Sequence, residues 1–151
     1  MLSKPIIVIV TGAFHRPSHY DAVIRPLQEK GFQVLVPILS TGNGDPEMTH
    51  FDDVKAIHSD LLPLLDEGNE AVIVSHSYGS LPASHSIENQ TLSERAARGL
   101  KGGIKHYICV TGMAYPAKGR SFMGDESEFP AMPYHRVEVG LRFVTIPDRL
   151  A

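Results

Sequence analysis

The segment AVIVSHSYGS, residues 71–80, constrains the fold more than any other part of the chain. A short apolar run rich in β-branched residues ends here in small polar residues, and a run that could form a helix follows. This order is typical of a buried strand, a very tight turn and a helix. Because the helix must leave close to the end of the strand, positions 75 and 79 must be small, and they hold Ser75 and Gly79. The pattern therefore places Ser77 at the apex of the turn, with its hydroxyl exposed above a sheet.

The five residues from Ser75 to Gly79 are close to the pattern G-x-S-x-G, which presents a nucleophilic serine on a strand-to-helix turn. Ser75 replaces the first glycine, and serine is small enough to keep that geometry. The pentapeptide alone is a moderate signal, so a serine-rich turn without chemistry is the alternative interpretation.

Strand and helix patterns alternate along the rest of the chain. We expect strands at 6–10, 32–37, 71–76 and 106–111, helices at 18–30, 52–66, 78–90 and 92–99, and a small hairpin within 135–146. This alternation predicts an α/β fold with three layers, α/β/α, and a mainly parallel sheet with strand order second, first, third, fourth. The crevice of such a sheet opens where the winding reverses, between the first and third strands. The loop at 11–16 is therefore expected to meet Ser77 there.

Composition limits the partners and the location of the chain. Its 151 residues suit one domain, and a net charge of -3 without a basic block gives no reason to expect nucleic acid or an anionic membrane as partner. No stretch approaches the roughly 18 apolar residues of a membrane-spanning helix, and the apolar run at 5–14 is better explained as a strand than as a signal peptide. Cys109 is the single cysteine, which excludes an internal disulfide and fits a reducing compartment. We therefore expect a cytoplasmic protein in which Cys109 is a small core residue.

Several stretches, taken together, resemble the α/β-hydrolase superfamily, especially its small esterases of the plant methylesterase and hydroxynitrile-lyase group. They are residues 7–15, 20–21, 31–34, 53–54, 75–79, 94–97 and the strand ending at 111. The resemblance covers about residues 5–122, with Thr11 standing where the family commonly has histidine. It implies a partial α/β-hydrolase fold, with 1–122 as the N-terminal part of the core and 123–151 as the beginning of a cap or an irregular tail.

The resemblance also implies roles for individual residues. Ser77 is the nucleophile, and the backbone amides of Ala13 and Tyr78 form the oxyanion hole. Phe14, His15 and Met113 are expected to line the substrate pocket.

The base that would activate Ser77 is the difficult part of this hypothesis. The family orders its triad as serine, acid, histidine, and the resemblance implies that this chain stops before the later strands that carry the last two. His85 is expected on a helix that points away, His106 at the wrong end of the sheet, and His76 directed away from the serine. His135 remains as the candidate base, with a solvated tail histidine as the alternative.

Two further patterns are weaker. Val10-Thr11-Gly12-Ala13 begins like a dinucleotide fingerprint but lacks its further glycines, so no cofactor is expected. His15 and His19 have the spacing of metal ligands, but no HExxH motif or carboxylate accompanies them, and no metal is expected.

The sequence therefore predicts a hydrolase that cleaves carboxylic esters of a small apolar substrate through Ser77. The alternative is a truncated or non-catalytic chain that binds a ligand or partner. The fourth strand should be an unpaired edge, at which a homo-oligomer or a completing chain could pair.

Overall fold

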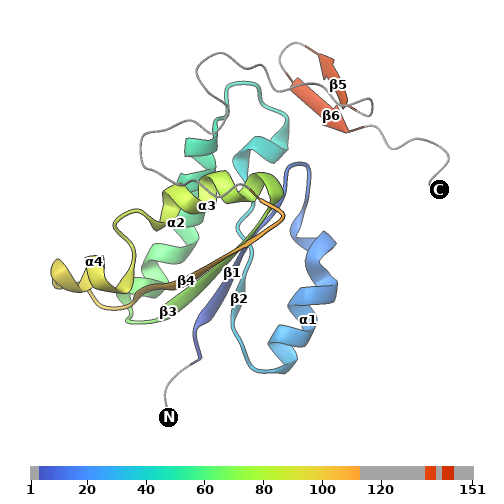
Figure 1. The fold of residues 1–151 in the computed structure, drawn as a ribbon. Coiled ribbons are helices and arrows are strands. Elements are labelled where there is room, and N and C mark those ends of the chain that lie inside the picture. The colour runs from blue at the N-terminus through green and yellow to red at the C-terminus, as the bar shows by residue number, and fades with distance from the viewer. Residues whose placement is uncertain (1–3, 113–134, 139–140, 145–151) are drawn as a thin grey trace.

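The computed structural model describes residues 4–112, 135–138 and 141–144, and centres on a four-stranded parallel sheet (Figure 1). The strands are β1 (Ile6–Val10), β2 (Val34–Leu35), β3 (Glu70–His76) and β4 (Gly103–Val110). Their order is β2-β1-β3-β4, with every pair parallel. The predicted strand order, second, first, third, fourth, is therefore confirmed.

Helices cover both faces of this sheet (Figure 1). They are α1 (Asp21–Glu29), α2 (His50–Asp66), α3 (Ser80–Ile87) and α4 (Leu92–Ala97), with short 3-10 turns η1 (Pro17–Tyr20), η2 (Ser40–Asn43) and η3 (Ser77–Gly79). A separate antiparallel hairpin pairs β5 (His135–Glu138) with β6 (Leu141–Val144), as predicted.

Strand β1 holds the two halves of the core together, because all five of its residues are buried. Its even-numbered residues pack with Ile57, Leu61 and Leu65 of α2. Its odd-numbered residues pack with Ile24 and Leu27 of α1. A continuous apolar strand buried on both faces is what a central parallel strand requires.

Several predicted boundaries were wrong. Strand β2 pairs only at Val34–Leu35 rather than over 32–37, because only these two residues lie opposite Ile7 and Val8 and Pro37 has no N–H to donate. Strand β4 begins three residues early, because Gly103 pairs with Glu70.

The helices differ from their predicted bounds as well. Helix α1 begins at Asp21 after a 3-10 turn, not at Ser18, and its Val23 is 53% exposed. Helix α3 ends at Ile87 rather than near 90, and the next backbone amide, that of Glu88, donates to His85.

Strand β4 forms one edge of the four-stranded sheet, and its residues from Lys105 to Val110 are exposed. Cys109 is among them, so the prediction of a core cysteine was wrong. The apolar residues around Cys109 do not indicate its burial, because the burial of a strand depends on which segments cover it. In the described part of the chain, α4 contacts β4 near Gly103 and Ile104, which are buried. No helix in the described residues is both long and apolar enough to cross a bilayer.

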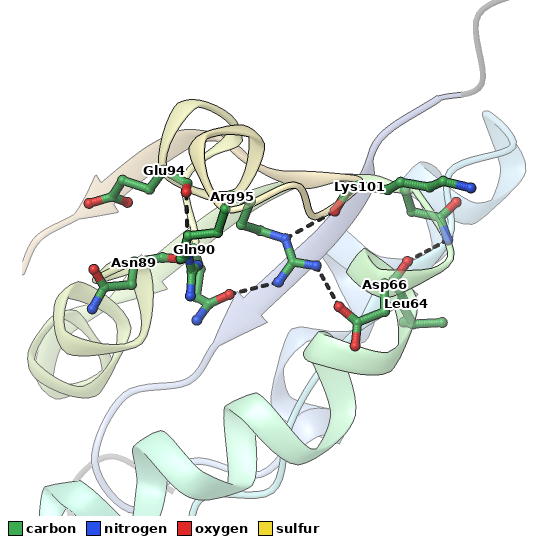
Figure 2. Close-up of polar contacts among 9 residues, drawn as sticks. Leu64, Asp66, Asn89, Gln90, Glu94, Arg95 and Lys101 are labelled. Atoms are coloured by element: carbon green, nitrogen blue, oxygen red, sulfur yellow. Dashed lines mark hydrogen bonds and ion pairs between the residues drawn. The ribbon is translucent and has the colours of Figure 1, made fainter.

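Arg95 joins the end of α2 to α4 and to the turn that precedes β4 (Figure 2). Its buried guanidinium donates to Asp66 Oδ1 at 2.5 Å, to Gln90 Oε1 at 2.9 Å and to the Lys101 carbonyl at 3.0 Å. Three acceptors from three segments satisfy the charge, which would otherwise be costly to bury.

We expect Arg95→Ala to lower the free energy of unfolding by about 3 kcal/mol, because it leaves a cavity in place of a buried side chain and removes three hydrogen bonds. Urea denaturation followed by circular dichroism measures this loss. Arg25→Ala is the matched control: Arg25 is 73% exposed in its pair with Asp21, and it should change stability by less than about 0.5 kcal/mol. Equal losses for the two variants would contradict a structural role for Arg95.

Candidate active site

Ser77 lies where β3 ends and η3 begins, in a backbone conformation that serine rarely adopts. Its φ is 51°, in the left-handed region, and the residue is exposed. Such strain persists only when the surrounding structure enforces it, and it is concentrated at functional sites. The tight turn predicted at this serine is therefore present.

Gly79 explains how the turn can be so tight. A methyl group on Gly79 would lie 2.4 Å from the carbonyl oxygen of Thr11 and 2.5 Å from that of Val10. The first turn after Ser77 thus contacts the backbone at the end of β1, and only glycine fits there. Ser75 is small enough for this turn and also forms a hydrogen bond: its buried hydroxyl donates to the Tyr107 hydroxyl of β4 at 2.9 Å.

The loop after β1 forms a turn that faces the tight turn at residues 75–79, hereafter the elbow. The amide of His15 donates to the Gly12 carbonyl at 3.2 Å, Phe14 has a φ of 63°, and Nδ1 of His15 is hydrogen-bonded to the Ala13 carbonyl at 2.8 Å. Within residues 4–112, the structure gives the Ala13 amide N–H no hydrogen-bond acceptor. An amide without a partner in a fixed turn can bind an anionic oxygen.

Tyr20 connects this loop to the elbow. Its hydroxyl accepts the Gly12 N–H at 2.9 Å and shares a 2.7 Å hydrogen bond with Nδ1 of His76. The His76 ring thus lies against the loop after β1. The sequence analysis missed Tyr20, although residues 20–21 belong to the stretches that carry the family resemblance.

Tyr78, on the other side of Ser77, is bound to α2. Its hydroxyl donates to Oδ2 of Asp53 at 2.7 Å. Asp53 is fully buried, whereas its neighbour Asp52 forms a capping box with the N-cap residue Thr49, whose N–H its side chain accepts. A sequence signal existed, since Asp53 stands four residues before Ile57 on the apolar face of the helix.

Five of the predicted site residues therefore gather at the carboxyl edge of the sheet. Ala13, Phe14 and His15 come from the loop after β1, and Ser77 and Tyr78 from the elbow. Met113 and the side chain of His135 lie outside the described residues. Within residues 4–112, the Ser77 hydroxyl has no hydrogen bond to a histidine, and no three His, Cys, Asp or Glu side chains are arranged to hold a metal ion. The rings of His15 and His19 are 5.5 Å apart, edge to face.

A parallel sheet in this order, with a strained exposed serine after its third strand, is typical of an α/β hydrolase. The model of the alpha/beta hydrolase family matches residues 7–149, and the chain belongs to this family.

Two relatives show the same kinship, and one solved structure shows the same fold. The chain is 31% identical over 122 residues to the alpha/beta hydrolase nvfD of Aspergillus novofumigatus, covering 80% of this chain and 48% of that protein. It is 30% identical over 123 residues to the probable hydrolase R7 of a Phoma species, covering 80% of this chain and 47% of the relative.

The solved structure is an extracellular alpha/beta-hydrolase from a Paenibacillus species, which superposes with a TM-score of 0.58 at 16% identity. The match covers 74% of this chain and 42% of that structure. The chain thus spans about half the length of these relatives, and at 16% identity the superposition shows a common fold.

Beside Asp53, a second cluster packs the beginning of α2 against α3. The His50 ring lies 4.0 Å from that of Phe51 and 5.0 Å from that of His85, centroid to centroid. Nε2 of His50 is buried without a hydrogen-bond partner among the described residues. Burial, and then the charge of His85, lower the pKa of His50, and Asp53 offsets part of that effect.

Gly79→Ala should lower the free energy of unfolding by about 3 kcal/mol, because the added methyl group meets two backbone carbonyls that cannot move aside. Gly42→Ala is the control, since nothing lies within 4 Å of that position, and we expect it to change stability by less than about 0.5 kcal/mol. Thermal or urea unfolding compares the two variants. A Gly79→Ala variant as stable as Gly42→Ala would show that the close approach is not a constraint.

The lowered pKa of His50 predicts an acid-dependent loss of stability. The unfolded chain binds the proton at about pH 6.5 and the folded chain only at lower pH, so stability is retained above that value and falls as the pH drops toward the folded pKa. His50→Phe should flatten the curve below about pH 6.5, measured by urea denaturation at each pH.

One further variant and the ionisation of Asp52 help to isolate the contribution of His50. His85→Gln should reduce the loss in part, because the charge of His85 contributes to the lowered pKa of His50. Hydrogen bonds from Lys55 and then Thr49 hold the pKa of Asp52 well below its usual range, so that carboxylate stays ionised throughout the measurement. An unchanged slope in His50→Phe would refute the assignment.

Proposed function

We propose that the chain carries the nucleophile and the oxyanion hole of a serine hydrolase that cleaves carboxylic esters. The observation that carries the proposal is Ser77 itself, exposed with a φ of 51° at the apex of the β3–α3 turn. An α/β hydrolase needs this geometry to bring a serine hydroxyl to a substrate carbonyl.

In this mechanism the Ser77 oxygen attacks the ester carbonyl, its proton passes to a base, and the carbonyl oxygen becomes an oxyanion. The amides of Tyr78 and Ala13 would bind that oxyanion from two sides. The Ala13 amide supports this role because it has no other acceptor within residues 4–112. The oxyanion then collapses as the ester C–O bond breaks, and the base returns the proton to the departing alcohol. Water finally hydrolyses the acyl ester of Ser77 and releases the carboxylic acid.

A small apolar substrate is supported by the apolar side chains around this edge of the sheet. Phe14 on the loop after β1 is 47% exposed. Ile38 and Met48, which lie between β2 and α2, and Phe51, in the first turn of α2, are also exposed. Exposed apolar side chains grouped beside a polar site are typical of a ligand-binding region.

The base and the acid of the mechanism would lie outside residues 4–112. His135 is the candidate base within this chain, and another copy or a completing chain is the other source. The Ser77 hydroxyl has no hydrogen bond to a histidine in the described residues, and this favours a second candidate function, a module that binds a ligand or partner without turnover. A serine without a base is a weak nucleophile.

Labelling with an alkyl fluorophosphonate, followed by intact-mass measurement, separates the two functions. An activated serine displaces fluoride and forms one phosphonyl adduct, so we expect fast labelling that Ser77→Ala abolishes and His135→Ala slows. Ser59→Ala, at an exposed serine of α2, is the control and should label at the parent rate. Labelling no faster than that of an ordinary serine would contradict the hydrolase and favour the binding module.

A further inference from the structure

Asp53 is a completely buried carboxylate that accepts three hydrogen bonds at the contact between α2 and the elbow. Its Oδ2 accepts the Tyr78 hydroxyl at 2.7 Å and the Thr41 hydroxyl at 2.8 Å, and its Oδ1 accepts the Thr41 N–H at 3.0 Å. None of these donors is a cation. A buried carboxylate is stable only when such donors satisfy it, so the three groups and Asp53 constrain one another.

The bond from Tyr78 has a consequence for the backbone of the elbow. Tyr78 is joined to the strained Ser77 at one end and to Asp53 through its hydroxyl at the other. A tyrosine side chain has only two rotatable angles, so fixing the hydroxyl restricts the Cα position and the peptide that precedes it. That peptide contains the Tyr78 N–H, one of the two proposed oxyanion donors.

Thr41 extends the connection to a third segment. It lies in η2, in the connection after β2, and its N–H and hydroxyl both bond to the same carboxylate. Asp53 thereby joins the connection after β2, helix α2 and the elbow through a single group. The function of the residue is then more than filling the helix contact, since an apolar side chain could do that without the cost of burying a charge.

We propose that Asp53 is a positioning residue of the active site, which holds the Tyr78 hydroxyl and thereby aims the Tyr78 amide at the oxyanion. The inference rests on the proposed function for the chemistry that the amide performs. The observed contacts carry the positioning itself.

The test compares Tyr78→Phe, which removes only the hydroxyl, with Asp53→Ala in the full 151-residue chain. Asp52→Ala is a matched control, because the neighbouring carboxylate also accepts hydrogen bonds, from Thr49 and Lys55, but caps the helix away from the elbow. We expect the first-order rate constant for phosphonylation of Ser77 to fall roughly tenfold in Tyr78→Phe and Asp53→Ala, since a displaced oxyanion donor loses part of its effect. The half-saturating probe concentration should not change.

The double variant adds a second criterion. If the two residues act through one contact, Tyr78→Phe combined with Asp53→Ala should label as slowly as the slower single variant, not a hundredfold slower. Asp52→Ala should label at the parent rate constant per folded molecule, even where it unfolds at lower urea. Parent rate constants in both Tyr78→Phe and Asp53→Ala would overturn the positioning role while leaving Ser77 as an activated nucleophile.

Amide spectra of ¹⁵N-labelled protein make the positioning testable without any reaction. The resonances of Ser77 and Tyr78 should shift in Tyr78→Phe and Asp53→Ala and stay in place in Asp52→Ala. If the parent protein does not react with the fluorophosphonate but the variants show these shifts, the proposed function is rejected. The positioning of the elbow by Asp53 is then still supported. Unshifted resonances in both variants would overturn the positioning role of Asp53, whatever the rate of phosphonylation.

Discussion

The contact of Gly79 with the last carbonyls of β1 is the constraint on which the site depends. It brings the first turn after Ser77 against the end of the neighbouring strand. A Cβ atom on Gly79 would lie within 2.5 Å of two backbone carbonyl oxygens there. The elbow and the loop after β1 are therefore held at one distance by the backbone itself. Because the two proposed oxyanion amides belong to these two segments, their separation is set by packing and does not require a ligand.

Three tyrosine hydroxyls secure the residues around the strained serine. Tyr107 bonds to Ser75, Tyr20 to His76, and the hydroxyl of Tyr78 to Asp53. They come from β4, η1 and the elbow itself, so the turn is fixed from separate directions. This arrangement explains how a serine can keep a φ of 51°, since an isolated residue in that conformation would relax.

The parts of this structure that local patterns determine could be predicted from the sequence. The apolar run of β1, the elbow around Ser77 and the strand order follow from periodicity, small residues and the handedness of crossovers. The contacts of Asp53 with Tyr78 and of Tyr20 with His76 could not be derived in this way, because each joins residues at least 25 positions apart through one side chain. The length of β2 and the exposure of Cys109 also depend on neighbouring segments, so the pattern within one segment does not predict them.

Tyr107 gives the exposed edge of the sheet a direct connection to the nucleophile. Its backbone belongs to β4, whereas its hydroxyl accepts the Ser75 hydroxyl and lies 3.4 Å from the Ser80 carbonyl, on the two sides of Ser77. Any strand that docks along β4 would stiffen the chain at Tyr107 and, through that phenol, the turn that presents the serine. Pairing of a further strand with β4 and the conformation of the turn at Ser77 would then be coupled through the side chain of Tyr107.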